Sequence, residues 1–429
     1  MDRSLRRILT SFAATVVAVL VAAPFAAASQ DPYSERQWAL DRVRAEKAWS
    51  IGGKGKGVTI AIVDSGVDLA HEDLKGAFVD GRDFVDDDAD ASDEHGHGTH
   101  VAGIAAARAN NGVGVAGVAP EAKIMPVRVL NDEGSGTGAD VDAGIRWAAD
   151  HGADVINLSL SDGDVVIESL FGDSLNASLD YAWSKGAVPV VVSGNDGFFR
   201  TQLASANALM VTATGPDDTK PGYANSVGFA KWAIAAPGGT SESQRSMVFS
   251  TLWTASGKTN YGWAYGTSMA APHVAGAAAI LRGLGLSPQQ TVDRLLSTAR
   301  DIGNAGRDNT YGSGLLDVAA AASGIRRLPG TKAAGTAAPS SPSTAPSPER
   351  RADEASSTVT PGAAEAEPSS GADATVSLPA ASDRASPSAP LRAVDDVPSR
   401  RPPMLVALAL ASVLAAAGCT AALALRLRR

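Results

Sequence analysis

Three short apolar runs in the first half of the chain each end abruptly in polar residues. GVTIAIVDSG reaches Asp64, ADVINLSLSDG reaches Ser159 and Ser161, and AVPVVVSGNDG reaches Asn195. Amphipathic helical patterns, such as residues 138–151, lie between the first run and the last. Continuous apolar runs that alternate with helices are typical of a parallel sheet covered on both faces. The sequence therefore predicts an α/β fold.

The polar residues that follow these runs are expected to meet at one edge of the sheet. The carboxyl ends of the strands in an open parallel sheet share an edge, and ligands bind there. One such residue alone would be an ordinary turn residue. Three runs that bring polar residues to the same edge indicate a functional site.

The first 28 residues have the pattern of a secretory signal peptide. MDRSLRR supplies positive charge, an apolar stretch follows, and Pro24 precedes an A-x-A site at residues 26–28. We predict cleavage after about Ala28. The alternative is an uncleaved anchor, because the apolar stretch is long for a signal.

A second apolar segment, residues 404–425, contains no charged side chain. A helix of this length rises about 1.5 Å per residue and spans roughly 33 Å, which is enough to cross a bilayer. We predict a single transmembrane helix here and a short cytoplasmic tail at residues 426–429. The signal peptide implies that the main domain is extracytoplasmic, held at the cell membrane. A buried core helix is the alternative for this segment.

Residues 326–401 are rich in Ala, Pro, Ser, Thr, Glu and Asp. Such a composition buries too little apolar surface to offset the entropy of ordering, so we predict a disordered linker. Residues 29–325 are left as one large domain. The only cysteine, Cys419, lies in the apolar C-terminal segment, so no internal disulfide is possible.

The net charge of the chain is −9, and acidic and basic residues are mixed along it. No long basic run lies outside the two ends. This pattern argues against a nucleic-acid partner.

The segment YGTSMAAPHVAG, residues 265–276, places Ser268 at the start of a predicted helix. The free N–H groups and the positive end of the helix dipole would lie beside its hydroxyl. We expect Pro272 in the first turn, where a missing N–H costs little. Nucleophilic hydrolysis needs such a hydroxyl, a base, and a group that orients the base. Taken alone, Ser268 would more often be a helix N-cap.

Candidates for the base lie in DEHGHGTHVAGIAAA, which contains His95, His97 and His100. Asp64, at the end of the first apolar run, is the candidate for the orienting group, and a turn or cap is its alternative. A zinc site is the alternative for the three histidines. The H-E-x-x-H pattern is absent and no other cluster of ligands is evident, so we predict no catalytic metal.

IAIVDSGVD, HGHGTHVAG and YGTSMAAPHVAG resemble the three active-site signatures of the subtilisin-like serine proteases, in that family's order along the chain. The resemblance covers roughly residues 35–325. It implies a three-layer sandwich with a central, mostly parallel sheet and helices on both faces. It also implies Asp64 as the orienting group, His97 as general base and acid, and Ser268 as the nucleophile.

Two further segments extend this resemblance. VVSGNDG is similar to the family's oxyanion-hole segment, which implies Asn195 as a side-chain donor with the Ser268 backbone N–H as its companion. NLSLSDG resembles the strand edge that pairs with an extended substrate, which implies that Ser159, Leu160 and Ser161 bind substrate. Ser161 departs from the glycine that often occupies its place in the family.

Asp73 and the loop NNGVGVAG are similar to a segment that binds structural calcium in some family members. The similarity implies Asp73 and Asn111 as ligands, together with loop carbonyls. The alternative is a calcium-free loop. No cofactor is implied for catalysis.

The order of signal peptide, protease, disordered spacer and C-terminal membrane helix resembles the mycosins, membrane-anchored subtilisin-like proteases associated with bacterial type VII secretion. This resemblance implies a serine endopeptidase that cleaves exported proteins or peptides, with the plasma membrane and a type VII secretion complex as partners. The disulfides usual in mycosins are missing. The alternatives are a protease-like scaffold subunit that stabilises a secretion complex and a general surface protease.

Overall fold

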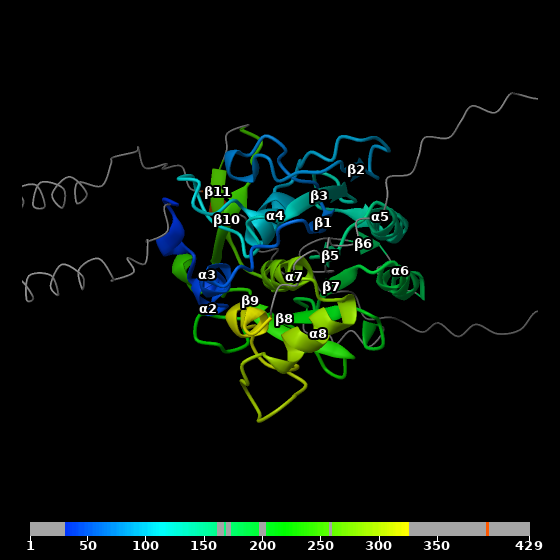
Figure 1. The fold of residues 1–429 in the computed structure, drawn as a ribbon. Coiled ribbons are helices and arrows are strands. Elements are labelled where there is room, and N and C mark those ends of the chain that lie inside the picture. The colour runs from blue at the N-terminus through cyan, green and yellow to red at the C-terminus, as the bar shows by residue number, and fades with distance from the viewer. Residues whose placement is uncertain are drawn as a thin grey trace, which may run out of the picture.

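The computed structural model describes residues 31–160, 167–168, 173–196, 203–256, 260–325 and 392–393. A central sheet lies between two layers of helices (Figure 1). The predicted signal peptide and transmembrane helix lie outside the described residues. Within the described part of the chain, no helix is both long enough and apolar enough to cross a bilayer.

The central sheet has seven strands in the order β2-β3-β1-β5-β7-β8-β9, and every pairing in it is parallel. The strands are β1 (Thr59–Asp64), β2 (Arg82–Asp83), β3 (Lys123–Arg128), β5 (Val155–Leu158), β7 (Val188–Val192), β8 (Leu209–Thr214) and β9 (Trp232–Pro237). Because β1 lies between β3 and β5, the strand order reverses at β1, and ligands favour the crevice at such a reversal.

The predicted α/β fold with a mostly parallel sheet is confirmed. The three apolar runs form β1, β5 and β7. Asp64 is the last residue of β1, while Ser159 follows β5 and Asn195 follows β7. The helical pattern predicted over residues 138–151 forms α5 (Gly138–Asp150). Thr137 begins this helix, because its hydroxyl accepts a hydrogen bond from the Asp140 amide.

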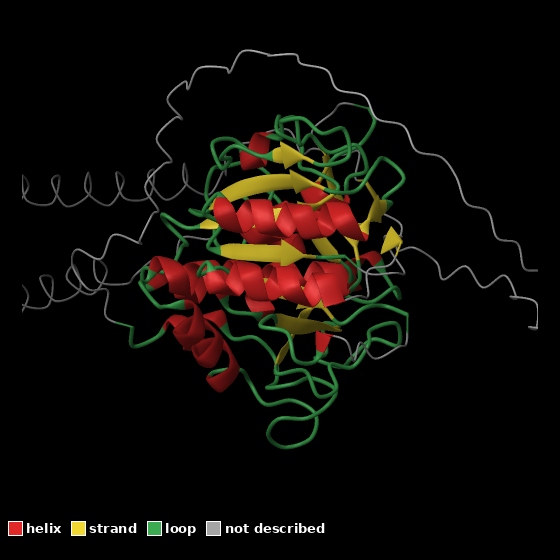
Figure 2. Cartoon of the chain, turned by 90° about the vertical axis from the view of Figure 1, so that its right-hand side faces the viewer, coloured by secondary structure: helices red, strands yellow, loops and turns green. Residues whose placement is uncertain are grey.

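Helices cover both faces of the sheet. The helices α4 (His97–Ala106) and α7 (Thr267–Gly283) pack on one face, and α5 and α6 (Asp173–Ser184) pack on the other. Figure 2 shows two helices on the near side that run alongside the strands. Side chains alternate along β1, so that Ile60 and Ile62 enter one core while Ala61 and Val63 enter the other.

The remaining elements are short or lie at the margins of the sheet. They are η1 (Ser34–Arg36), α2 (Trp38–Arg42), α3 (Ala45–Ser50), η2 (Glu72–Leu74), β4 (Gly136–Thr137), β6 (Ile167–Glu168), η4 (Gln244–Ser246), β10 (Val248–Leu252), β11 (Asn260–Ala264), α8 (Pro288–Ser297), α9 (Val318–Ala322) and β12 (Arg392–Ala393). Two of them matter for the site, because β10 packs against α4 and pairs with β11.

The strand β12 comes from the segment that the sequence predicts to be a disordered linker. It pairs antiparallel with β11, with Ala393 opposite Gly262 and Arg392 opposite Trp263. These two residues are the part of the predicted linker that the structure describes.

One expectation about α7 changes with the structure. Pro272 is the sixth residue of α7, so it lies beyond the first turn, where we expected it. Gly276 lies where α7 contacts its neighbours: a Cβ added there would lie 3.0 Å from the Ala105 carbonyl oxygen and 2.6 Å from the Val118 Cβ. Gly276 therefore lets α7 approach α4 and the Val118 loop.

Candidate active site

Asp64 is the last residue of β1, and its carboxylate is fully buried. One carboxylate oxygen, Oδ1, accepts a hydrogen bond from the Ser65 backbone N–H at 2.8 Å. The same oxygen lies 2.7 Å from His97 Nδ1. An ionised carboxylate only accepts hydrogen bonds, so Nδ1 carries the proton and Nε2 is the basic nitrogen of a neutral His97 ring. This is the tautomer that a general base facing a nucleophile requires.

Asp93 fixes the point at which α4 begins, four residues before His97. Its buried carboxylate accepts backbone hydrogen bonds from His95, Gly96 and Thr99 at 2.8–2.9 Å. Burial raises the pKa of the Asp93 carboxyl, and these hydrogen bonds oppose that shift. The negative charge also lies at the positive end of the helix dipole. Asp93 therefore holds the turn of chain that presents the His97 ring.

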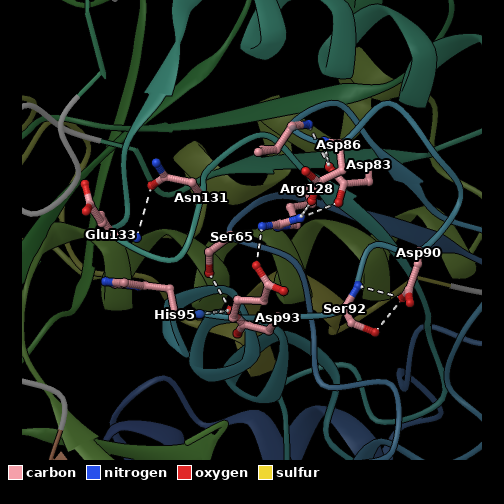
Figure 3. Close-up of polar contacts among 12 residues, drawn as sticks. Ser65, Asp83, Asp86, Asp90, Ser92, Asp93, His95, Arg128, Asn131 and Glu133 are labelled. Atoms are coloured by element: carbon pink, nitrogen blue, oxygen red, sulfur yellow. Dashed lines mark hydrogen bonds and ion pairs between the residues drawn. The ribbon is translucent and has the colours of Figure 1, made fainter. Parts of the chain in front are cut away.

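Ser65 links the turn after β1 to this helix start. Its hydroxyl donates to Asp93 at 2.9 Å and accepts from the Gly98 N–H at 3.0 Å (Figure 3). A side chain at Gly98 would not fit, because its Cβ would lie 2.0 Å from the Gly66 carbonyl oxygen. Close contact between α4 and the β1 turn thus keeps Asp64 and His97 within hydrogen-bond reach.

Ser268 is the second residue of α7 and is buried. Its N–H is one of the first-turn amides that have no acceptor within a helix, as the predicted role in an oxyanion hole requires. Its hydroxyl donates to the Ser159 carbonyl oxygen at 3.0 Å. The helices that carry His97 and Ser268, α4 and α7, pack against each other along the same face of the sheet.

Asn195 follows β7 and is half-buried at the same edge. Its Oδ1 atom accepts hydrogen bonds from the Thr267 backbone N–H and the Thr267 hydroxyl, both at 3.0 Å. Because a backbone N–H can only donate, this contact identifies the amide oxygen and makes Nδ2 the donor end of the side chain. The residue before the predicted nucleophile therefore orients the predicted oxyanion donor.

Of the three residues predicted to bind substrate, Ser159 and Leu160 directly follow β5 and are buried. Ser161 lies outside the described residues. An apolar hollow adjoins Leu160, and it is lined by Val141, Leu158, Leu160, Leu175, Val191, Val192 and Leu203. The hydroxyl and the carbonyl oxygen of Ser159 both form hydrogen bonds with Ser268, an arrangement that the sequence did not suggest.

The two other histidines of the HGHGTH region differ in their surroundings. The His95 ring centroid lies 6.4 Å from that of His97, and its ring packs against Gly134. His100 is fully buried, and its Nε2 lies 3.2 Å from the Gly262 carbonyl oxygen. Among the described residues, no three His, Cys, Asp or Glu side chains are grouped to hold a metal ion.

Sequence reasoning missed several residues that hold this site together. Thr267 lies inside the motif YGTSMAAPHVAG, and its hydroxyl was the one feature from which a hydrogen bond to Asn195 could have been predicted. Arg128, at the end of β3, is buried and forms ion pairs with Asp83, Asp86 and Glu94 at 2.5–2.6 Å, which tie down the loop before α4 (Figure 3). These partners lie 34 to 45 residues away along the chain, so no local pattern signalled them.

Two buried histidines predict how stability depends on pH. Burial lowers the pKa of His100 to about 3 and that of His273 to about 4, from an ordinary 6.5. Because each folded pKa lies below the unfolded one, the stabilisation is complete above pH 6.5 and is lost as the pH falls toward 4. At pH 5 we expect the free energy of unfolding to be lower by roughly 2 kcal/mol per histidine than at pH 8.

Denaturant unfolding at pH 8 and pH 5, in a Ser268→Ala background to prevent self-cleavage, measures this loss. His273→Asn should shrink the difference between the two pH values by roughly 2 kcal/mol. Ser178→Ala, which removes a buried hydroxyl but no titratable group, should leave the difference unchanged. An equal difference in all three proteins would contradict the assignment to His273.

The chain is similar in sequence to several known proteins. The model of the subtilase family, peptidase S8, matches residues 55–314. Thermitase from Thermoactinomyces vulgaris is 42% identical over 279 residues, which cover 64% of this chain and 93% of thermitase. Subtilisin DY from Bacillus licheniformis is 38% identical over 292 residues, which cover 66% of this chain and 98% of subtilisin DY.

A solved structure of a protease from Pseudoalteromonas arctica has a TM-score of 0.60 and 30% sequence identity to this chain. The match covers 70% of this chain and 99% of that one. The family model spans more than half of the chain, and these relatives are proteases. The chain therefore belongs to the subtilase family, peptidase S8, and is a subtilisin-like serine endopeptidase that needs no cofactor for catalysis.

Proposed function

We propose that Asp64, His97 and Ser268 perform the peptide hydrolysis. His97 Nε2 takes the Ser268 proton as the hydroxyl oxygen attacks a peptide carbonyl, and the imidazolium then protonates the leaving amine. Asp64 keeps the proton on Nδ1 and stabilises the imidazolium. Water releases the acyl-enzyme by the same steps in reverse order. The observation that carries this assignment is the 2.7 Å contact between the buried Asp64 carboxylate and His97 Nδ1.

Asn195 and the Ser268 N–H are proposed to hold the oxyanion that forms during each attack. Thr267 supports this role, because its N–H and hydroxyl donate to the Asn195 amide oxygen. The Asn195 NH₂ group, which is the donor, then faces away from Thr267. Such donors act on charge that develops only in the transition state, so they raise the rate rather than the substrate affinity.

We further propose that the enzyme is anchored by one helix in the cell membrane and cleaves a small set of exported proteins in association with a type VII secretion complex. Three sequence features support this: the signal-like residues 1–28, the linker at 326–401, and the uncharged segment 404–425. A membrane helix joined to the protease domain by a linker restricts the enzyme to substrates that reach the extracytoplasmic face of the cell membrane. That restriction favours a processing protease over a general surface protease.

Three strains separate this proposal from its alternatives: wild type, Ser268→Ala and a deletion. A processing protease predicts that specific exported proteins stay uncleaved in both altered strains. A scaffold predicts that secretion changes only in the deletion strain. Membrane fractionation with externally added protease tests the anchor, and recovery of the full chain in the soluble fraction would contradict it.

We propose in addition that a structural calcium ion binds at Asp73. Burial raises the pKa of the Asp73 carboxyl to about 8, and the buried carboxylate of Asp31 adds to this shift. Two buried carboxylates near each other fit a cation. The predicted ligand Asn111 fits less well, because its amide nitrogen faces Asp73 at 2.8 Å.

Thermal unfolding with and without a chelator tests the calcium proposal. We expect chelation to lower the midpoint by about 5–10 °C, since an ion bound only to the folded state stabilises it by a few kcal/mol. Asp73→Asn should abolish this sensitivity, whereas Asp154→Asn, at a carboxylate that accepts from the Thr59 N–H, should retain it. An unchanged midpoint in the wild type would exclude the ion.

A further inference from the structure

Pro272 leaves the carbonyl oxygen of Ser268 without its usual helical partner. The N–H of each residue in an α-helix bonds the carbonyl four residues earlier, so residue 272 would serve Ser268. Proline has no N–H. The carbonyl oxygen of the predicted nucleophile therefore has no partner from within α7, and it is buried with its residue.

Ser159 occupies this acceptor from the end of β5. Its hydroxyl donates to the Ser268 carbonyl oxygen at 2.9 Å, and the Ser268 hydroxyl donates back to the Ser159 carbonyl oxygen at 3.0 Å. Both residues are at most 1% exposed. Two hydrogen bonds in opposite directions thus join the same two residues and fix the start of α7 against the sheet.

Asn157 determines which way the Ser159 hydroxyl points. Its Nδ2 group donates to Ser159 Oγ at 2.9 Å, and its side chain is fully buried within β5. A hydroxyl that accepts from Asn157 has its single proton left for the Ser268 carbonyl oxygen. An aspartate here would accept that proton instead and leave the Ser268 carbonyl unsatisfied.

We propose that Asn157 is a positioning residue for the nucleophile, acting through Ser159 on the carbonyl that Pro272 leaves free. The inference rests on the proposed role of Ser268. Asn157 lies on the strand behind Ser268 and belongs to neither the predicted triad nor the predicted oxyanion hole. Its loss should therefore change the geometry of attack more than the binding of substrate.

A double-mutant cycle between Asn157→Ala and Ser159→Ala tests this relay. Each single variant should lower kcat about tenfold, the effect expected for loss of one buried hydrogen bond, with KM changed less than about twofold. The double variant should be no slower than Ser159→Ala alone, because both changes remove the same contact. Asn157→Asp should match Asn157→Ala although it keeps the side-chain shape. Additive losses, or a wild-type rate in Asn157→Asp, would overturn the proposal.

Pro272→Ala provides a second test, which changes the other partner of the Ser268 carbonyl. Alanine supplies the missing N–H, so Ser159 is no longer the donor on which the Ser268 carbonyl depends. In this background Asn157→Ala should lower kcat less than about threefold. An undiminished tenfold loss would contradict the role assigned to Pro272.

Active-site titration normalises the rates of the variants that keep Ser268 to active enzyme, and the unfolding midpoint shows whether Ser268→Ala is folded. Ser178→Ala, at a fully buried serine in α6, serves as the matched control. Ser268→Ala is measured first. If it retains activity, the proposed function fails. If it is inactive and the cycle is additive, only the positioning role fails.

Discussion

Replacing Ser268 with alanine is expected to lower kcat for a peptide substrate by about 10⁶-fold while leaving the fold intact. We take this magnitude from subtilisin, a member of the same family. Without the hydroxyl no acyl-enzyme forms, and only substrate binding and the oxyanion donors still accelerate hydrolysis. The fold should persist, because the change removes one hydrogen bond, from the Ser268 hydroxyl to Ser159, worth about 1 kcal/mol.

Steady-state hydrolysis of a peptide library, read by mass spectrometry, measures this loss. Ser178→Ala removes a serine hydroxyl that is equally buried but lies in α6, so its kcat should stay within about twofold of wild type. Circular dichroism and the unfolding midpoint show whether each variant is folded. Activity within tenfold of wild type in a folded Ser268→Ala protein would remove Ser268 from the mechanism.

Replacing Asp64 with asparagine is expected to lower kcat by about four orders of magnitude, the effect of the equivalent change in another Asp-His-Ser protease. The Asp64 carboxylate accepts from His97 Nδ1 and from the Ser65 N–H with one oxygen. An amide of the same shape fills the same space, so the turn should survive, but an NH₂ group turned toward His97 loses the contact with the Ser65 N–H. It carries no charge to stabilise the imidazolium, and its NH₂ end favours the wrong tautomer of His97.

Asp154→Asn is the matched control for this change. Asp154 accepts from the Thr59 N–H at 3.0 Å, at the end of β1 opposite to Asp64. Asp154→Asn also removes one negative charge beside the central sheet, but it changes no residue of the proposed active site. Its kcat should therefore stay close to wild type. A folded Asp64→Asn enzyme with near-normal kcat would show that another group orients His97.

The strands were predictable because their signal is local. Each of β1, β5 and β7 is a continuous apolar run, and burial on both faces of a parallel sheet requires such runs. The polar residue after each run, Asp64, Ser159 or Asn195, could then be placed at one edge from topology alone. Nothing beyond the direction of the chain was needed.

The contacts that orient these residues were not predictable, because their partners are distant in sequence. Ser159 and Ser268 are 109 residues apart, and Thr267 and Asn195 are 72 residues apart. Pro272 shows how a local rule fails. We expected a proline in the first turn because it costs least there, whereas in the structure a hydroxyl from another element satisfies the carbonyl that Pro272 leaves free.

The resemblance to a family selected His97 among three histidines, and the structure gives a physical reason for this selection. His97 contacts the Asp64 carboxylate, whereas His100 faces a backbone carbonyl and burial lowers its pKa to about 3. A base with a pKa that low would take a proton from serine poorly at neutral pH. Composition and spacing alone contain no such distinction.

In the mechanism proposed above, one serine, activated by His97, attacks the peptide carbonyl. Treatment of the full-length protein with a fluorophosphonate probe, followed by peptide mapping, tests this mechanism. We predict one adduct per chain, on the Ser268 oxygen, formed rapidly in wild type and not detectably in His97→Ala. An adduct on a different serine, or peptide hydrolysis that continues while Ser268 stays unmodified by excess probe, would contradict the claim.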